Sequence, residues 1–267
     1  MLELKKIILL LFVIQTLGSC SDYNKVLNKG TIAEKYSMAT QLYDAKKFSK
    51  ALRLFEMIVP SYRGKPQMER IQFMISQSYF NTGDYFNAAF YFERFAKNYS
   101  KSSKVEDAEF NAAKSYFLAS PKYSLDQADT KKALDAFQKY INAYPNSKRI
   151  AESNLMVSKL QHKLEKKAFE IAKQYYEIGY FNSAIVAFDN MTSEYLGTSF
   201  REEALFYKFK SSFELGMRST LRKKENRLNA AVKAFEKLQR NFPNSDYMNE
   251  SKKLLKQIKQ QQKIVNS

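Results

Sequence analysis

The sequence predicts an all-α protein: a solenoid of five helical hairpins with a long linking helix between the third and the fourth. Three observations support this fold class. Glycine (7 residues) and proline (5) are scarce among the 267 residues, which disfavours a fold with many turns and strands. One apolar pattern with offsets 0, 3, 4, 7, 10, 11 and 14 occurs five times, and these offsets mark one face of an α-helix. A second pattern with offsets 0, 3 and 7 precedes each copy, so each unit is a helix A, a turn and a helix B.

The first 19 residues are expected to be an export signal. Lys5 and Lys6 precede the apolar run 7–14, and small residues follow it. A basic start, a short apolar stretch and small residues before a cleavage site are typical of a secretory signal peptide. The apolar run is too short to span a bilayer by itself. We therefore assign 1–19 to a signal peptide that is removed from the mature protein.

Cys20 is the only cysteine, and its surroundings indicate a lipid anchor. It stands directly after Leu17-Gly-Ser, which resembles the lipobox of bacterial lipoproteins, in which this cysteine becomes the acylated N-terminus. The resemblance implies a covalent lipid on Cys20 and a lipidated N-terminal tether over 20–30. Ser21 is compatible with the outer membrane, because Asp at this position favours retention in the inner membrane of proteobacteria.

The five hairpins share a strict residue pattern. Every B copy has Ala at its second position and Phe at its fourth, so that a neighbouring helix can approach the Ala while the Phe fills the space beside it. The A helices start at Tyr36, Phe73, Phe110, Phe169 and Phe206, and the B helices start at Phe48, Tyr85, Thr130, Phe181 and Leu228. Helix pairs with this pattern resemble tetratricopeptide (TPR) repeats, and the match covers about 31–260.

A long helix is expected between the third and fourth hairpins. The spacing of the A helices grows there, and the added stretch 150–163 has no Gly or Pro and is rich in Leu, Lys and Glu. We expect one linking helix over 148–178. It separates an N-terminal TPR half, 31–147 with repeats 1–3, from a C-terminal half, 167–267 with repeats 4–5 and a capping helix.

Two hairpins carry extra residues between their helices, and the tail caps the stack. The insertions cover 118–129 in the third hairpin and 214–227 in the fifth. The expected cap has an apolar inner face and a basic outer stripe, since a solenoid needs a polar-faced end for solubility. The inner residues are Leu254, Leu255 and Ile258, and the stripe is Lys252, Lys256, Lys259 and Lys263.

The sequence offers no catalytic or metal-binding constellation. His162 is the only histidine, and we interpret it as a satisfied or solvated side chain that belongs to no metal cluster and no catalytic triad. The Gly-rich phosphate-binding motifs are absent. The aromatic residues occupy core positions of the repeats, which favours packing over a stacking platform for glycans or nucleic acid. We expect no enzyme activity, no metal, no cofactor apart from the lipid, and no nucleic-acid partner.

Several landmarks resemble one family. They are the segment 20–27 that leads directly into the first repeat, the insertion Ser120–Thr130, the Tyr144-Pro-Asn-Ser motif, and the helix 163–179. Together with the lipobox they look like the BamD family, in its Bacteroidetes form. BamD is the TPR lipoprotein of the machine that folds β-barrels into the outer membrane.

The resemblance implies a non-enzymatic scaffold, lipid-anchored on the periplasmic face of the outer membrane. In the family the C-terminal repeats dock on the periplasmic POTRA domains of BamA, and the N-terminal repeats receive the C-terminal β-signal of unfolded β-barrel substrates. Because A helices line the concave side of peptide-binding TPR modules, the candidate substrate residues are Tyr36, Tyr43, Phe73 and Phe80. The candidate partner residues are Tyr175, Tyr176 and Tyr180. Each is also a core position or its neighbour, so a purely structural role stays open.

Two other functions are also compatible with the sequence. The alternatives are another periplasmic TPR adaptor, associated with peptidoglycan or the envelope, and a glycan-binding lipoprotein.

The chain is strongly basic. The net charge is +17, and loss of the signal peptide with two lysines and one glutamate leaves +16. The densest basic segments are 218–227 and 252–263. We expect this basic C-terminal end to meet an acidic partner or lipid head groups, with binding that salt weakens.

Overall fold

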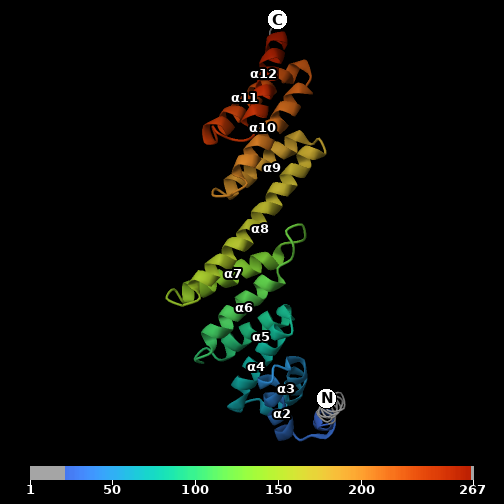
Figure 1. Ribbon diagram of the computed structural model, residues 1–267, viewed down its shortest axis with the longest axis vertical. Coiled ribbons are helices and arrows are strands. Elements are labelled where there is room, and N and C mark those ends of the chain that lie inside the picture. Colours follow the sequence, from blue (N-terminus) through green and yellow to red (C-terminus); the bar gives the residue numbers. More distant parts are fainter. Residues whose placement is uncertain (1–21, 266–267) are drawn as a thin grey trace, which may run out of the picture. The chain divides into compact units, whose positions relative to one another are not determined.

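The computed structural model describes residues 22–265, which form helices and no strand. The helices follow the predicted order, as Figure 1 shows: α2 (Ile32–Asp44) with α3 (Phe48–Tyr62), α4 (Gln67–Asn81) with α5 (Tyr85–Asn98), α6 (Val105–Ala119) with α7 (Ala128–Ala143), α8 (Ile150–Glu177) with α9 (Phe181–Glu194), α10 (Arg201–Met217) with α11 (Leu221–Asn241), and finally α12 (Met248–Val265). The predicted all-α fold of five hairpins is confirmed.

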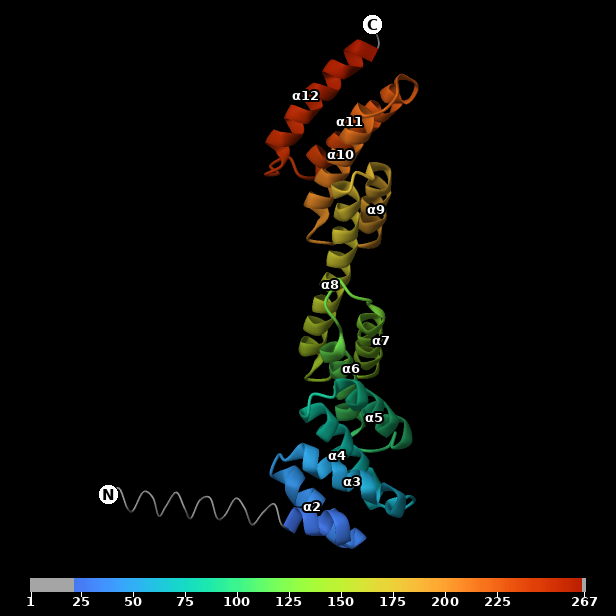
Figure 2. The same cartoon turned by 90° about the vertical axis from the view of Figure 1, so that its right-hand side faces the viewer.

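The chain divides into two compact units. Unit 1 comprises the residues up to Pro121 together with Ala128–Val157, and unit 2 comprises Lys122–Gln127 and the residues from Ser158 onward. Within each unit the hairpins stack on one another (Figures 1 and 2). Each unit has its own buried apolar clusters, centred in unit 1 on residues such as Phe92 and in unit 2 on residues such as Phe188. The predicted halves 31–147 and 167–267 stay a prediction as functional domains.

α8 is the long helix that the sequence predicts. It has 28 residues and runs over Ile150–Glu177, close to the expected 148–178. Its uninterrupted Leu, Lys and Glu content explains the length, because these residues have high helix propensity. The turn after it contains Gly179, whose φ of 83° lies in the left-handed region that only glycine adopts at little cost.

The two insertions fold differently. In the third hairpin the extra residues form a loop over 120–127, whereas in the fifth they lengthen α10 to Met217 and let α11 begin at Leu221. The lengthened helices meet at Gly216, which is fully buried. A Cβ atom there would lie 2.8 Å from Leu228 Cδ2 and 3.3 Å from Leu228 N, so a larger residue would have to displace the Leu228 side chain.

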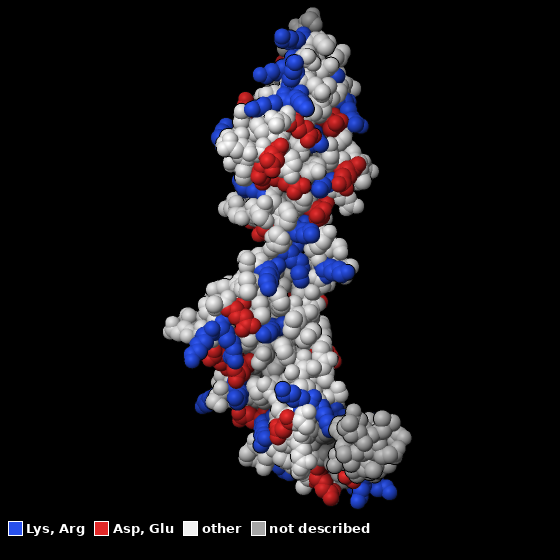
Figure 3. All heavy atoms as spheres, in the orientation of Figure 1, with Lys and Arg blue, Asp and Glu red and all other residues white. Residues whose placement is uncertain are grey.

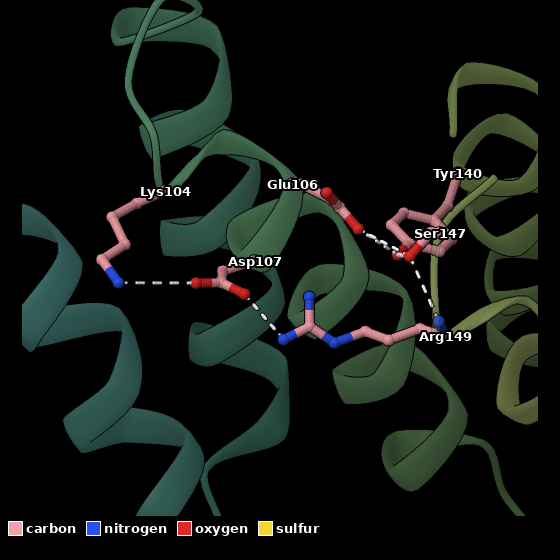
Figure 4. A network of polar contacts seen from close by, with 6 residues as sticks. All are labelled: Lys104, Glu106, Asp107, Tyr140, Ser147 and Arg149. Carbon is pink, nitrogen blue, oxygen red and sulfur yellow. Dashed lines mark hydrogen bonds and ion pairs between the residues drawn. The ribbon is translucent and has the colours of Figure 1, made fainter. Parts of the chain in front are cut away.

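A side-chain hydroxyl stabilises the loop that follows helix B, where the sequence predicts the helix to end. Ser147 Oγ donates to Glu106 Oε1 at 2.6 Å and accepts the backbone N–H of Arg149 at 3.2 Å (Figure 4). Tyr140 also donates to Glu106 Oε1 at 3.1 Å, and Arg149 Nη2 lies 2.7 Å from Asp107 Oδ1. The network ties the start of α8 to the start of α6, within unit 1.

The same hydrogen bond from a hydroxyl to a glutamate recurs in other repeats. Ser102 Oγ donates to Glu69 at 2.5 Å, and Thr198 Oγ1 donates to Glu165 at 3.0 Å. In each case the hydroxyl also accepts a backbone N–H two residues later. This satisfies polar groups at the break and explains why Ser or Thr stands in the loop after helix B.

Tyrosine hydroxyls form hydrogen bonds between successive hairpins of unit 1. The Tyr116 hydroxyl of α6 donates to Glu93 Oε2 of α5 at 3.0 Å. Tyr79 of α4 makes the same bond to Glu56 of α3, one repeat earlier. Burial, assisted by the neighbouring Glu93 carboxylate, raises the pKa of the Tyr116 hydroxyl to about 12.

The raised pKa predicts an alkaline limit to stability. An unfolded tyrosine ionises near pH 10, whereas folded Tyr116 stays neutral up to about 12. The stabilising contribution is therefore complete below pH 10 and is lost as the pH rises toward 12. We expect Tyr116→Phe to reduce the fall in the free energy of unfolding between pH 9.5 and 11.5, measured by urea denaturation. Tyr175→Phe, at an exposed tyrosine, serves as the control and should follow the wild-type profile.

The chain enters the first hairpin through a short packed helix. Residues 22–29, assigned to a tether by the sequence, are helical, and their Tyr23 and Leu27 are buried in the core cluster of α2 and α3. Lys50 Nζ lies 5.0 Å from the centroid of the Tyr23 ring, which places Tyr23 beside the first turn of α3. Folded structure therefore begins within a few residues of Cys20.

Candidate binding surfaces

The described part of the chain contains grooves and charged faces rather than a reaction centre. No group of three or more His, Cys, Asp or Glu side chains in it could hold a metal ion. His162 stacks on Phe200 with 5.1 Å between ring centroids, so packing accounts for the one histidine. Among residues 22–265 no helix has the length and apolar character that crossing a bilayer requires.

Unit 1 has a groove of about 550 Å³ between its A helices. Tyr43 of α2 and Phe73 of α4 line it, together with Phe95 of α5. The Tyr43 hydroxyl donates to the side-chain oxygen of Gln77, which fixes the ring at the groove wall. Burial and the nearby Asp44 raise the pKa of Tyr43, so this hydroxyl remains a neutral hydrogen-bonding group.

The structure brings together two of the four candidate substrate residues. Tyr43 and Phe73 share the groove. Tyr36 instead packs on Tyr62 of the first hairpin, with 5.4 Å between centroids. Phe80 packs on Tyr85 at 5.7 Å. Neither Tyr36 nor Phe80 lines the groove.

The groove also carries two cationic residues that the aromatic pattern did not reveal. Arg70 and Lys104 line it together with the acidic Glu69 and Asp44. Lys104 Nζ lies 3.7 Å from Asp107, whereas Arg70 has no ion pair within the described residues. Arg70 precedes Phe73 by three positions, which puts both on one side of α4, and that spacing was the available signal.

The three candidate partner tyrosines of unit 2 fall into different environments. Tyr176 packs in the core against Tyr207 at 5.3 Å and Phe181 at 5.9 Å. Tyr175 and Tyr180 are exposed, with 37% and 63% of their surfaces accessible. Tyr176 is half-buried, so Tyr175 and Tyr180 offer more surface to another molecule than Tyr176 does.

Unit 2 also has a strongly basic groove of about 470 Å³ between α9, α10 and α11. Its lining includes the apolar residues Ile185 and Leu215, and all of its charged residues are positive. The cationic residues are Lys208, Arg227, Lys233 and Lys237. Lys208 is paired with Asp189 at 2.5 Å, and Arg227 donates to Ser219 at 2.8 Å. Lys233 and Lys237 form no ion pair in the part of the chain that the structure covers.

The corresponding groove of unit 1 shows that this charge is not a general feature of the repeats. That groove, about 400 Å³ between α5, α6 and α7, is lined by Glu93 and Glu109 as well as Lys97 and Lys139. Its charges balance, whereas those of the unit 2 groove do not. The unit 2 groove is therefore suited to an acidic ligand.

The capping helix extends the basic surface. Ile258 of α12 is fully buried, while Leu254 and Leu255 are half-buried against α10 and α11. The four lysines of the expected stripe are exposed. Figure 3 shows Lys and Arg side chains gathered over α11 and α12.

The comparison with known proteins decides the family. A family model described as "YfiO: Outer membrane lipoprotein" matches residues 28–228, well over half of the chain. The chain belongs to this family.

Curated relatives align with most of this chain. The outer membrane protein assembly factor BamD of Rickettsia prowazekii is 26% identical over 259 residues, covering 96% of this chain and 98% of that protein. BamD of Neisseria meningitidis serogroup B is 22% identical, covering 92% and 94%. BamD of Caulobacter vibrioides is 23% identical, covering 82% and 69%. Among solved structures, a kinesin light chain from Podosopora anserina with TPR-like repeats aligns at 13% identity and a TM-score of 0.33, covering 78% of this chain and 96% of that one.

Membership of the YfiO family confirms the resemblance to BamD and the prediction of a non-enzymatic protein. It places the chain among outer membrane lipoproteins. The organisms of these relatives give no support to the narrower expectation of a Bacteroidetes form. Cys20, the expected lipidation site, lies outside the described residues and stays a prediction.

Proposed function

We propose that the protein is a lipid-anchored scaffold of the machinery that assembles β-barrel proteins in the outer membrane. It holds a BamA-like protein through unit 2 and receives unfolded substrates in unit 1. The observation that carries the proposal is the match to the YfiO family over 28–228, joined to relatives named outer membrane protein assembly factor BamD that align over nearly the full chain. The lipid on Cys20 keeps the scaffold on the periplasmic face of the outer membrane.

The groove of unit 1 is the proposed substrate site. Its aromatic walls, Tyr43 and Phe73, suit apolar side chains of an extended peptide. Arg70 and Lys104 suit the carboxylate at the end of a C-terminal β-signal, since a guanidinium pairs with a carboxylate in a bidentate manner. Of the four aromatic residues selected from the sequence, Tyr43 and Phe73 remain candidates for substrate contact.

Charge reversal tests the substrate site. We expect Arg70→Glu with Lys104→Glu to weaken binding of a fluorescent peptide that carries the C-terminal sequence of an outer-membrane barrel at least tenfold, measured by fluorescence polarisation. The same peptide with an amidated C-terminus should bind the wild-type protein more weakly than the free acid does, by a similar factor. Arg53→Glu, on the exposed face of α3 outside the groove, is the control. Equal affinity for the acid and the amide would contradict a carboxylate site.

The basic groove of unit 2 is the proposed docking site for an acidic surface of the BamA periplasmic domains. Its four cationic residues face no acidic lining residue, and its apolar lining residues can bury a side chain of the partner. Exposed charges attract less strongly as salt rises, because the Debye length falls to about 3 Å at 1 M. Docking through this groove is therefore salt-dependent.

Affinity capture from detergent-solubilised outer membrane tests the docking role. We expect BamA to be recovered with the wild-type protein at low salt and to decline as NaCl rises. Lys233→Glu with Lys237→Glu should reduce recovery at least fivefold. Lys252→Glu with Lys256→Glu makes the same charge change on α12, outside the groove, and should reduce it less. Recovery of peptidoglycan-binding proteins without BamA would instead support the adaptor alternative.

A further inference from the structure

One helix face in unit 2 is exposed although its counterparts in the other repeats are buried. Counted from the first Phe of each A helix, residues at positions −2, +2 and +5 form one face. This face is Ile71, Ile75 and Ser78 on α4, Ala108, Ala112 and Ser115 on α6, and Ala204, Lys208 and Ser211 on α10. Eight of these nine residues are buried, and only Lys208 is partly accessible.

The buried faces receive the preceding B helix. α3 packs on α4, α5 on α6, and α9 on α10. The serine at position +5 in each is small, and its hydroxyl is bonded back to its own helix, as for Ser78 with the Met74 carbonyl at 2.7 Å. Such a position lets a neighbouring helix come close without leaving a polar group unpaired. The face is thus a helix-receiving surface throughout the solenoid.

On α8 the same register is open. Ile171 occupies position +2 and is 43% exposed, and Tyr175 follows one turn later at 37%. Ile178 continues the stripe and is 56% exposed. The spacing 171, 175, 178 is one apolar stripe of a helix. The Tyr175 hydroxyl has no partner among the described residues, whereas its counterparts Tyr79 and Tyr116 donate to a Glu of the helix packed on them.

A rigid loop forms the second wall of a groove along this face. Lys167 Nζ donates to the Leu125 carbonyl at 2.5 Å, and Lys166 Nζ lies 4.6 Å from the Tyr123 ring centroid. Gln127 holds the loop together by donating to the carbonyls of Lys122 and Leu125 at 2.8 and 2.9 Å. Between the loop and α8 a groove of about 430 Å³ remains.

The charges along the groove define the ligand. Glu170 and Glu177 line it, and neither forms an ion pair within residues 22–265. The one lysine of the lining, Lys167, is already bonded to the loop. Gln174 stands where the buried faces have serine, so a docked helix lies farther from α8 than the B helices lie from their partners.

We propose that this face of α8 receives an amphipathic helix of a partner protein, with an apolar stripe for Ile171, Tyr175 and Ile178 and with Lys or Arg on its flank for Glu170 and Glu177. The helix takes the place that a B helix takes on the other A helices. The proposal rests on the proposed scaffold role for the identity of the partner, but not for the chemistry of the face. It gives Tyr175 a contact role and leaves Tyr176 in the core.

Two synthetic helical peptides of 20 residues test the face directly. Both carry a leucine stripe at helical spacing, one with lysine flanks and one with glutamate flanks. We expect the full mature chain to bind the lysine-flanked peptide at least tenfold more tightly in fluorescence polarisation. The mature chain has a net charge of +16, so unspecific attraction would favour the glutamate-flanked peptide. That order of affinities in the Lys233→Glu, Lys237→Glu variant, which removes binding to the basic groove, would overturn the proposal.

Variants locate the binding. Ile171→Asp with Ile178→Asp should weaken the lysine-flanked peptide at least tenfold, without unfolding because both side chains are largely exposed. Leu196→Asp, at a leucine of unit 2 that is 75% exposed elsewhere, should leave affinity unchanged. Unchanged binding by the double variant, with circular dichroism showing both variants folded, would refute the site.

Capture of BamA separates this inference from the proposed function. If the wild-type chain captures BamA and the Ile171→Asp, Ile178→Asp variant captures as much, the α8 face is refuted as its docking site and the scaffold role stands. If the wild type captures no BamA, the scaffold role fails. The peptide affinities then still show whether the α8 face binds an amphipathic helix. A photo-crosslinking residue at position 175 should label the partner in cells, while the same residue at the packed position 116 should not.

Discussion

Replacing Cys20 with serine is expected to release the protein from the outer membrane. The thiol is the only one in the chain and the proposed attachment point of the lipid. Buried acyl chains contribute about 0.8 kcal/mol per CH₂ group, and durable anchoring requires more than one chain. Within residues 22–265 no helix is long and apolar enough to cross the bilayer.

Fractionation of cells measures the release. Washing the membranes with 1 M NaCl removes protein held only by its basic surface, because exposed charges are screened at that salt concentration. The Cys20→Ser protein should appear in the soluble fraction with the helical circular dichroism of the wild type. Ser21→Ala keeps the cysteine and should remain with the membrane. Salt-resistant retention of Cys20→Ser would show that another element anchors the chain.

Replacing Phe92 with alanine is expected to destabilise unit 1 by about 3–5 kcal/mol. Phe92 is fully buried in α5, with Phe73 and Phe80 at 6.0 and 6.4 Å between ring centroids. Alanine would leave a cavity beside the rings of Phe73 and Phe80, which both belong to α4. Part of the loss is the transfer free energy of the ring, and part is the cavity itself.

The neighbouring Phe90 supplies the matched control. It lies on the same helix, is 53% exposed, and contacts Arg94 across 5.6 Å. Phe90→Ala should change the free energy of unfolding by no more than about 0.5 kcal/mol. Urea denaturation followed by circular dichroism compares the two. Similar losses in the free energy of unfolding for both variants would mean that burial of Phe92 does not stabilise the second hairpin.

The hairpins were predictable because burial follows the helical period. Ala51, Ala88 and Ala184 are at corresponding sequence positions and are all fully buried. The long α8 was predictable because nothing in 150–163 interrupts a helix. The fifth hairpin was different: spacing counts the extra residues between Leu215 and Leu228 but cannot tell a loop from two longer helices.

The candidate sites were less predictable, because apolar spacing marks a helix face without saying what covers it. Tyr43 and Phe73 reach a groove, while Tyr36, at the equivalent position to Phe73 one repeat earlier, packs against Tyr62. Tyr175 and Tyr176 are adjacent, yet a turn of about 100° between them separates an exposed ring from a half-buried one. Arg70 was missed because a single charge on a helix is ordinary until the groove around it is seen.

The burial of Tyr23 limits how far the protein can move from its membrane. Only Ser21 and Asp22 separate Cys20 from Tyr23, and a chain spans at most about 3.6 Å per residue. With a lipid on Cys20, the first hairpin stays within roughly 11 Å of the anchored residue. The segment between the lipid and the first hairpin is then too short to let the protein move far from the membrane surface. A substrate peptide in the groove of unit 1 would be held at a high local concentration beside the bilayer that it must enter.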